Sequence, residues 1–133
     1  QMYAVILLDL DYFKKINDTY GHDIGDQVLI TVSNILSNIA IEGDCLGRYG
    51  GEEFILILPA LNKDQAINIA NRCREAIAET LIRNEDGTEF NISASFGVAM
   101  SDETSKKEDV IRMADQALYI AKDKGRNQVQ FLS

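Results

Sequence analysis

Residues 2–11 read Met2-Tyr3-Ala4-Val5-Ile6-Leu7-Leu8-Asp9-Leu10-Asp11, and residues 2–8 of this stretch form the longest apolar run in the chain. A continuous apolar run, β-branched in part, is typical of a central strand whose two faces are both buried. It is far shorter than the roughly 20 apolar residues that span a bilayer. Because the run stops at Asp9, the sequence predicts a buried strand with carboxylates at its end.

A pair of glycines marks the next part of the sheet. β-like segments at 45–49 and 54–58 flank Gly50-Gly51, which predicts a hairpin with a tight turn and positive φ at the glycines. If this hairpin lies beside the first strand, oxygen ligands suited to a hard divalent cation meet at one rim of the sheet. They are the carboxylates of Asp9, Asp11, Glu52 and Glu53 and the Leu10 carbonyl. A solvated acidic turn is the alternative, and spacing alone does not choose between them.

Helical periodicity accounts for most of the remaining chain. Apolar residues recur at helical spacing from Ile24 to Ile39, from Asn62 to Leu81 and from Ser105 to Gly125. Asn62 is expected to cap the second helix, and Ser105 with Glu108 forms a capping box for the third. Strands are expected at Phe90–Met100, where Gly97 allows a close approach or a bulge, and at Gln128–Leu132, with a turn at Asn84–Gly87. The sequence therefore predicts an α/β or α+β fold, a sheet with helices packed on it.

Composition narrows the class of protein. The chain has 133 residues, 46% hydrophobic and 26% charged, which fits one globular domain of ordinary composition. Its formal charge of −8 disfavours binding to nucleic acid or to an anionic membrane. Cys45 and Cys73 lie in apolar segments without metal-ligand spacing, which predicts buried free thiols and a cytoplasmic location.

Several common active sites are absent from the sequence. It contains no GxxxxGK[ST] loop, no GxGxxG turn and no GxSxG elbow, and its single histidine, His22, excludes an HExxH zinc site. Nucleotide or metal chemistry must therefore rest on carboxylates.

Several polar residues can be interpreted either as ligand-binding residues or as residues with a purely structural role. Asn17 and Asp26 can together bind a guanine edge, or each can be a helix cap or turn residue. His22 is most often a local hydrogen-bonding residue. Lys122 and Arg126, one helical turn apart near a helix end, can clamp phosphates or merely interact with the helix dipole, which is worth roughly 0.3–1 kcal/mol.

Four separated motifs lie between about Tyr3 and Val129. One is Arg48-Tyr49-Gly50-Gly51-Glu52-Glu53-Phe54. The others are Asp9-Leu10-Asp11-Tyr12-Phe13-Lys14-Lys15-Ile16-Asn17-Asp18, then Tyr20-Gly21-His22 with Gly25-Asp26, and finally residues 114–127, which begin Ala114-Asp115-Gln116-Ala117-Leu118-Tyr119 and end Lys124-Gly125-Arg126-Asn127. In order and spacing these motifs resemble one known family, the GGDEF domains or diguanylate cyclases, with the signature segment in its GGEEF form.

The resemblance implies a palm-like nucleotidyl cyclase fold, a central mostly antiparallel sheet flanked by helices, and condensation of two GTP into cyclic di-GMP with release of two pyrophosphates. It implies these site residues: Asp9, Leu10 (carbonyl), Glu52 and Glu53 for Mg²⁺ or Mn²⁺; Asn17, Asp26 and His22 for guanine and its surroundings; and Lys14, Lys122, Arg126 and the Tyr12 and Phe13 amides for phosphates. Glu52 would also help to deprotonate the attacking hydroxyl, and Lys14 would neutralise charge on the transferred phosphate.

The resemblance also implies partners. Each domain holds one GTP, so catalysis needs a second copy of the domain, and a sensory or receiver domain is expected upstream in a parent protein that is cytoplasmic or membrane-tethered. Residues 1–133 correspond to a single GGDEF-like domain without the helix that usually precedes the first strand. Ile41 stands where many members carry the arginine of an RxxD product-inhibition motif that ends at Asp44, so tight inhibition there is not expected.

Two other readings stay open. A GGDEF-like domain without turnover would bind GTP or cyclic di-GMP as a receptor, and a cyclase with a different base site would use another purine.

Overall fold

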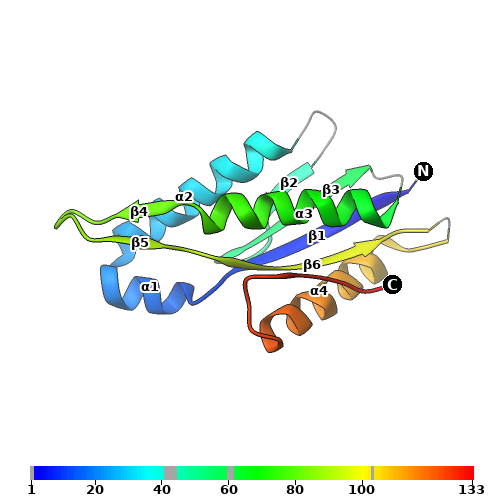
Figure 1. Ribbon diagram of the computed structural model, residues 1–133. Helices are drawn as coiled ribbons and strands as arrows, with labels where there is room; N and C mark the ends of the chain where they lie inside the picture. Colours follow the sequence, from blue (N-terminus) through cyan, green and yellow to red (C-terminus); the bar gives the residue numbers. More distant parts are fainter. Residues whose placement is uncertain (1, 41–44, 60–61, 103) are drawn as a thin grey trace.

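A five-stranded sheet lies at the centre of the computed structural model, which describes residues 2–40, 45–59, 62–102 and 104–133 (Figure 1). Its strand order is β2-β3-β1-β6-β7. All neighbouring strands are antiparallel except β6 and β7, which are parallel. The strands are β1 (Tyr3–Leu10), β2 (Cys45–Arg48), β3 (Glu53–Pro59), β6 (Ala94–Met100) and β7 (Val129–Phe131).

Helices cover both faces of this sheet. They are α1 (Phe13–Tyr20), α2 (His22–Ile39), α3 (Lys63–Ala78) and α4 (Lys107–Asp123). Side chains of β1 that share one face with Ile6 pack with α2 and α3, and those that share the other face with Val5 pack with α4. This explains the continuous apolar run, because alternate residues of a strand point to opposite faces and both faces are buried here. The predicted mixed fold with helices on a sheet is confirmed.

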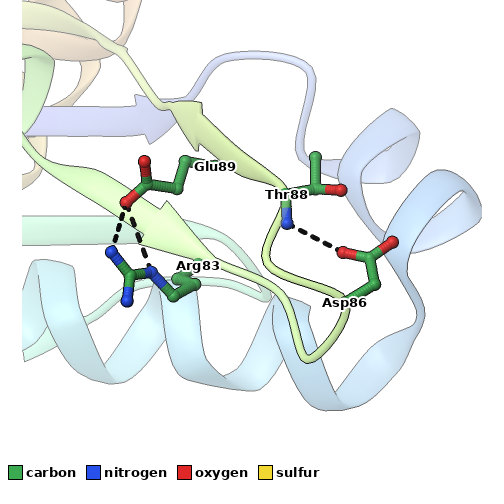
Figure 2. Close-up of polar contacts among 4 residues, drawn as sticks. All are labelled: Arg83, Asp86, Thr88 and Glu89. Carbon is green, nitrogen blue, oxygen red and sulfur yellow. Dashed lines mark hydrogen bonds and ion pairs between the residues drawn. The ribbon is translucent and has the colours of Figure 1, made fainter.

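A second, two-stranded sheet projects beyond the end of the main one, near α1 (Figure 1). It is a hairpin of β4 (Leu81–Arg83) and β5 (Glu89–Asn91). Arg83 forms an ion pair with Glu89 at 2.8 Å, and Asp86 Oδ1 accepts a hydrogen bond from the Thr88 amide in the turn (Figure 2). Phe90 stacks on Tyr20 with ring centroids 4.1 Å apart, which holds the hairpin against α1. The turn predicted at Asn84–Gly87 is confirmed, with Gly87 at φ +87°.

Two predicted boundaries next to this hairpin are wrong. Leu81 is not on the buried face of a helix, because α3 ends at Ala78 and Leu81 is a 56% exposed residue of β4. The strand predicted at Phe90–Met100 is broken between Asn91 and Ala94, so that β5 pairs with β4 while β6 pairs with β1. The Asn91 side-chain amide donates to the carbonyls of Ala78 and Thr80, which ties β5 to the end of α3 and away from the main sheet.

The two predicted helix caps have different outcomes. Asn62 Oδ1 accepts from the Gln65 amide at 2.9 Å, so the cap of α3 is confirmed. The capping box at Ser105 is wrong, because α4 begins at Lys107 and has no side-chain cap. Ser105 instead donates to Asp102 within the preceding loop, where the acceptor is a carboxylate rather than a backbone group.

The β2–β3 hairpin is confirmed, but its tight turn is not. Residues 49–52 connect the strands, and among the described residues the glycines with positive φ are Gly21, Gly87 and Gly125, not Gly50 or Gly51. Within this longer loop, the Arg48 guanidinium donates to the Gly51 carbonyl at 2.5 Å. A side chain therefore stabilises a connection that the sequence pattern assigned to a two-residue turn.

Two further predictions concern the two cysteines and the segment from Ile41 to Asp44. Cys73 is a buried free thiol as predicted, and burial raises its pKa to about 11. Ile41, Asp44 and the side chain of Cys45 lie outside the described residues. In the described part of the chain, no helix is both long and apolar enough to cross a membrane.

Replacement of Gly97 by alanine tests the packing of α4 on the sheet. A Cβ on Gly97 would lie 2.8 Å from Leu118 Cα and closer still to the backbone of Ala114, and backbone atoms cannot turn aside. We expect Gly97→Ala to lower the free energy of unfolding by about 1–3 kcal/mol in denaturant titrations.

Gly47→Ala is the matched control, because a Cβ there would meet only Ile55 Cγ2 at an ordinary 3.7 Å. Equal stability of the Gly97 and Gly47 variants would contradict the close approach of α4.

Candidate active site

A cavity of about 180 Å³ opens where β1 ends and α1 begins. Most of the residues predicted for cation and phosphate binding line it, although they come from three parts of the chain. The lining residues are Asp9, Leu10, Asp11, Tyr12, Phe13, Lys14, Glu52, Lys122 and Arg126. The β1–α1 connection forms one wall, the end of α4 forms another, and the β2–β3 loop contributes Glu52.

Strand pairing brings the two acidic segments together. In the antiparallel register of β1 and β3, Asp9 lies opposite Glu53, and the Leu10 amide donates to the Glu52 carbonyl at 3.3 Å. The sequence predicted this meeting on condition that the hairpin lies beside the first strand, and the condition is met.

Asp9 lies deeper than Glu52 and Glu53, at 7% exposure. Its Oδ2 forms an ion pair with Lys122 Nζ. Its Oδ1 is buried and has no hydrogen-bond partner among the described residues. A buried carboxylate oxygen without a partner is energetically costly, so a hydrogen-bond donor or a cation at Asp9 Oδ1 would stabilise the site.

Glu53 is held in an environment that disfavours its charge. Burial raises the pKa of the Glu53 carboxyl above its ordinary value, and the negative charge of Asp9 raises it further. Lys122 opposes this shift, while Asp115 and Glu52 add to it. An added positive charge between these carboxylates would reverse the effect.

These oxygen donors fit a hard divalent cation. The unpartnered Asp9 Oδ1 supplies a free ligand atom of the type that Mg²⁺ and Mn²⁺ prefer. Within the described ranges, however, no three acidic, cysteine or histidine side chains come close enough to form a complete cation site. The protein side chains would therefore hold such an ion only together with other oxygen atoms.

Asp11 is not free to join them. Its Oδ1 accepts from Ser95 Oγ at 2.7 Å, and its Oδ2 accepts from Ser93 Oγ at 2.6 Å and from the Asn127 amide at 3.1 Å. The expectation that Asp11 ligates a cation is therefore not supported, since donors already occupy both oxygens. No local sequence pattern predicts these partners, because Ser93, Ser95 and Asn127 lie more than 80 positions away from Asp11.

Arg126 reaches the cavity differently from the prediction. It does not continue the helix of Lys122, because α4 ends at Asp123 and Gly125 has φ +117°. Arg126 itself has φ +66°, its guanidinium donates to the Lys122 carbonyl at 3.3 Å, and it lies 4.9 Å from the centre of the Tyr12 ring. Lys122 and Arg126 nevertheless line one cavity together, and the Tyr12 and Phe13 amides lie at the start of α1 as expected.

The residues predicted to bind guanine lie outside this cavity. Asn17 packs against α2, where the lack of a Cβ on Gly25 lets the Asn17 side chain come close to the helix backbone. Asp26 lines a separate hollow of about 380 Å³ with Arg48, and His22 is an exposed residue at the start of α2. The structure thus brings Asn17 near the first turn of α2 but leaves His22 and Asp26 outside the 180 Å³ cavity.

Comparison with known proteins shows the family. The sequence profile described as "Diguanylate cyclase, GGDEF domain" matches residues 1–128. The chain belongs to the GGDEF domain family. It is 39% identical over 127 residues to diguanylate cyclase DosC of Escherichia coli strain K12, an alignment that covers 96% of this chain and 28% of DosC. The GGDEF domain described here therefore spans less than a third of that relative.

Solved structures confirm the fold of this GGDEF domain. The GGDEF domain of DgcB from Caulobacter crescentus, solved in complex with c-di-GMP, matches with a TM-score of 0.94 and 31% identity over 98% of this chain and 77% of that chain. The diguanylate cyclase SiaD of Pseudomonas aeruginosa, solved with its activator SiaC, matches with a TM-score of 0.93 and 35% identity over 99% of this chain and 50% of that chain. The mostly antiparallel sheet flanked by helices is thus the fold of the family.

The raised pKa of Glu53 predicts a pH-dependent stability. Below the ordinary pKa of a glutamate, Glu53 is protonated in both the folded and the unfolded chain, and it has no destabilising effect. As the pH rises through the ordinary value and then the raised value, the unfolded chain loses its proton first, and the folded state becomes less stable. We therefore expect Glu53→Gln to raise the free energy of unfolding at pH 7 but not at pH 3.

Denaturant titrations at the two pH values, without divalent cations, measure the difference. Glu85→Gln, in the exposed β4–β5 turn, is the control. A Glu53→Gln variant that is equally stabilised at both pH values would show that packing, not charge, is responsible.

Proposed function

We propose that this GGDEF domain is the catalytic part of a diguanylate cyclase that condenses two GTP into cyclic di-GMP and releases two pyrophosphates. The observation that carries the proposal is the 180 Å³ cavity, which Asp9 and Glu52 line together with Lys14, Lys122 and Arg126. Carboxylates beside cations suit a metal-bound triphosphate. The identity to DosC and the GGEEF form of the hairpin, Gly50-Gly51-Glu52-Glu53-Phe54, support it.

The triphosphate would be bound by the walls of this cavity. Lys122 and Arg126 would contact the terminal phosphates, and Lys14 would neutralise charge on the transferred phosphate. The Tyr12 and Phe13 amides lie at the start of α1, where the helix dipole favours anions. These groups are needed because the chain as a whole, with a net charge of −8, repels an anion.

Asp9, the Leu10 carbonyl, Glu52 and Glu53 would hold Mg²⁺ or Mn²⁺. When bound, such an ion offsets negative charge on the reacting phosphates and promotes ionisation of the attacking hydroxyl. Lys122 now pairs with Asp9, so a cation at Asp9 would release Lys122 Nζ for the phosphates.

The base would be recognised at α1 and α2. Asn17 would donate to the guanine ring oxygen, and Asp26 would accept from the ring and exocyclic nitrogens, with His22 in the same region. Because Asp26 lies outside the phosphate cavity, one GTP would extend from the end of β1 to α2. A cyclase for another purine would need a different partner for the base edge.

The reaction joins two nucleotides held by two domains. The 3′-oxygen of one GTP forms a bond to the α-phosphorus of the other, the bond from that phosphorus to pyrophosphate breaks, and Glu52 helps to remove the hydroxyl proton. Since each cavity supplies one GTP, a second copy of the domain must face it. A sensory or receiver domain in the parent protein would control this pairing, in the cytoplasm where GTP is available.

Glu52→Gln tests the catalytic role. The amide keeps the shape of the side chain but cannot accept the proton, and loss of a general base typically costs about 10²–10⁴ in rate. In a version fused to a dimeric coiled coil, we expect cyclic di-GMP formation from GTP to fall at least about 100-fold. Binding of a non-hydrolysable GTP analogue should change much less.

Chromatography of the products measures turnover, and Glu75→Gln on α3 is the control. Turnover within tenfold of the parent would exclude Glu52 as the base. If the parent itself binds GTP or cyclic di-GMP but forms no product, the domain is a receptor and not an enzyme.

Asp26→Ala tests base recognition. A site built to hydrogen-bond its ligand rejects one that leaves buried polar groups unpaired, with discrimination of up to roughly 10⁴-fold. We expect the ratio of ATP to GTP dissociation constants to fall at least about tenfold in the variant. Asn34→Ala, which alters the same hollow, is the control. An unchanged ratio in Asp26→Ala would assign base recognition to another residue.

A further inference from the structure

We propose that Asp11 is a positioning residue that holds the two phosphate-binding loops of the cavity in register. These loops are the β1–α1 connection, which carries Tyr12 and leads to Lys14, and the segment after α4, which carries Arg126. The inference rests on the proposed function for the identity of the ligand, and on the geometry alone for the role of Asp11.

Asp11 is connected to three segments that meet behind the cavity. The side chain is 5% exposed, and its carboxylate accepts from Ser95 at the start of β6, from Ser93 before it, and from the Asn127 amide after α4. Its own amide donates to the Ser93 carbonyl at 2.9 Å. Residue 11 is therefore fixed to the sheet by backbone and side chain together, while its Oδ2 reaches across to the C-terminal loop.

Strained backbone surrounds this carboxylate. Among described residues other than glycine, positive φ occurs at Tyr12 (+58°), Arg126 (+66°) and Asn127 (+46°). Left-handed conformations of such residues persist only where the surroundings enforce them. Asp11 is therefore joined to both strained segments, to Tyr12 by the peptide bond and to Asn127 by its carboxylate, which accepts from the Asn127 amide.

The two segments also contact each other on the cavity side. The Arg126 guanidinium lies over the Tyr12 ring, and both residues line the cavity with Lys14 and Lys122. Without the Asp11 link, the two loops would be joined on this side by the contact of Arg126 with the exposed Tyr12 ring. The distance between the Tyr12 and Phe13 amides and the Arg126 guanidinium would then vary, and groups on both sides could not bind one phosphate chain together.

The chemistry of the link explains why a carboxylate suits position 11. The Asn127 amide can only donate, and the two hydroxyls can donate or accept. A carboxylate accepts from all three at once. An asparagine could keep one oxygen toward Asn127 while Ser95 turns to accept from its amide, so it should preserve part of the link. Alanine removes the link entirely.

Binding of inorganic triphosphate tests the inference without any assumption about the base or turnover. We expect Asp11→Ala to raise the dissociation constant for triphosphate, with Mg²⁺ present, at least tenfold by calorimetry, and Asp11→Asn to have a smaller effect. Asp102→Ala is the matched control, because Asp102 accepts from Ser105 and Thr104 in a loop outside the cavity. Circular dichroism confirms that each variant is folded.

If Asp11→Ala does not fold, Ser93→Ala removes one of the two donors to Oδ2 and leaves the backbone contact of Ser93 in place; a two- to fivefold weakening is then expected. Unchanged triphosphate binding in the folded variant, or an equal weakening in Asp102→Ala, would overturn the inference. So would a parent domain that binds no triphosphate. A parent that binds triphosphate but no GTP analogue refutes the proposed function, and the role of Asp11 is still decided by the triphosphate comparison.

Discussion

The antiparallel pairing of β1 with β3 determines how the rest of this structure is arranged. β1 is covered on both faces, so α2 and α3 pack on one side, α4 packs on the other, and β6 takes the remaining edge of β1. The register of the pair places Asp9 opposite Glu53. A slip of one residue would turn Asp9 to the other face of the sheet and separate it from Lys122, because side chains alternate along a strand.

In this arrangement, a polar rim lies directly beside the apolar core. Asp9 has an unpartnered oxygen, and the pKa of Glu53 is raised by its burial and by neighbouring carboxylates. Left-handed backbone at Tyr12, Arg126 and Asn127 adds about 1–3 kcal/mol of strain each. Asp9, Tyr12 and Arg126 line the same cavity, and Glu53 and Asn127 each follow a residue that lines it. Strain and unsatisfied charge concentrated in one place are typical of a site that is organised before its ligand binds.

The sequence predicted those parts of the fold that depend on local patterns. The apolar run of β1, the cap at Asn62 and the close approach at Gly97 each follow from neighbouring residues, and each is confirmed. The predictions are wrong where a distant contact or a side-chain hydrogen bond determines the local structure. Asn91 breaks a continuous β-like stretch by binding the end of α3, Ser105 binds Asp102 in place of a helix amide, and Arg48 supports a longer turn. For the site, the residues around the cavity were predicted together, but the commitment of Asp11 to Ser93, Ser95 and Asn127 depends on tertiary contacts that no local pattern records.

The ion pair between Asp9 and Lys122 couples the binding of a cation to the binding of a triphosphate in the proposed site. In the protein alone, Lys122 compensates one oxygen of Asp9 while the other stays unpartnered, so the pocket is neither strongly cationic nor fully anionic. A divalent cation satisfies the carboxylates and leaves Lys122 without its partner. A triphosphate satisfies Lys122 and Arg126 but not the carboxylates. Each ligand therefore removes an imbalance that the other creates, and by linkage each must increase the affinity for the other. An acidic domain with a net charge of −8 can in this way bind a polyanion, since the cation offsets part of the negative charge of the nucleotide.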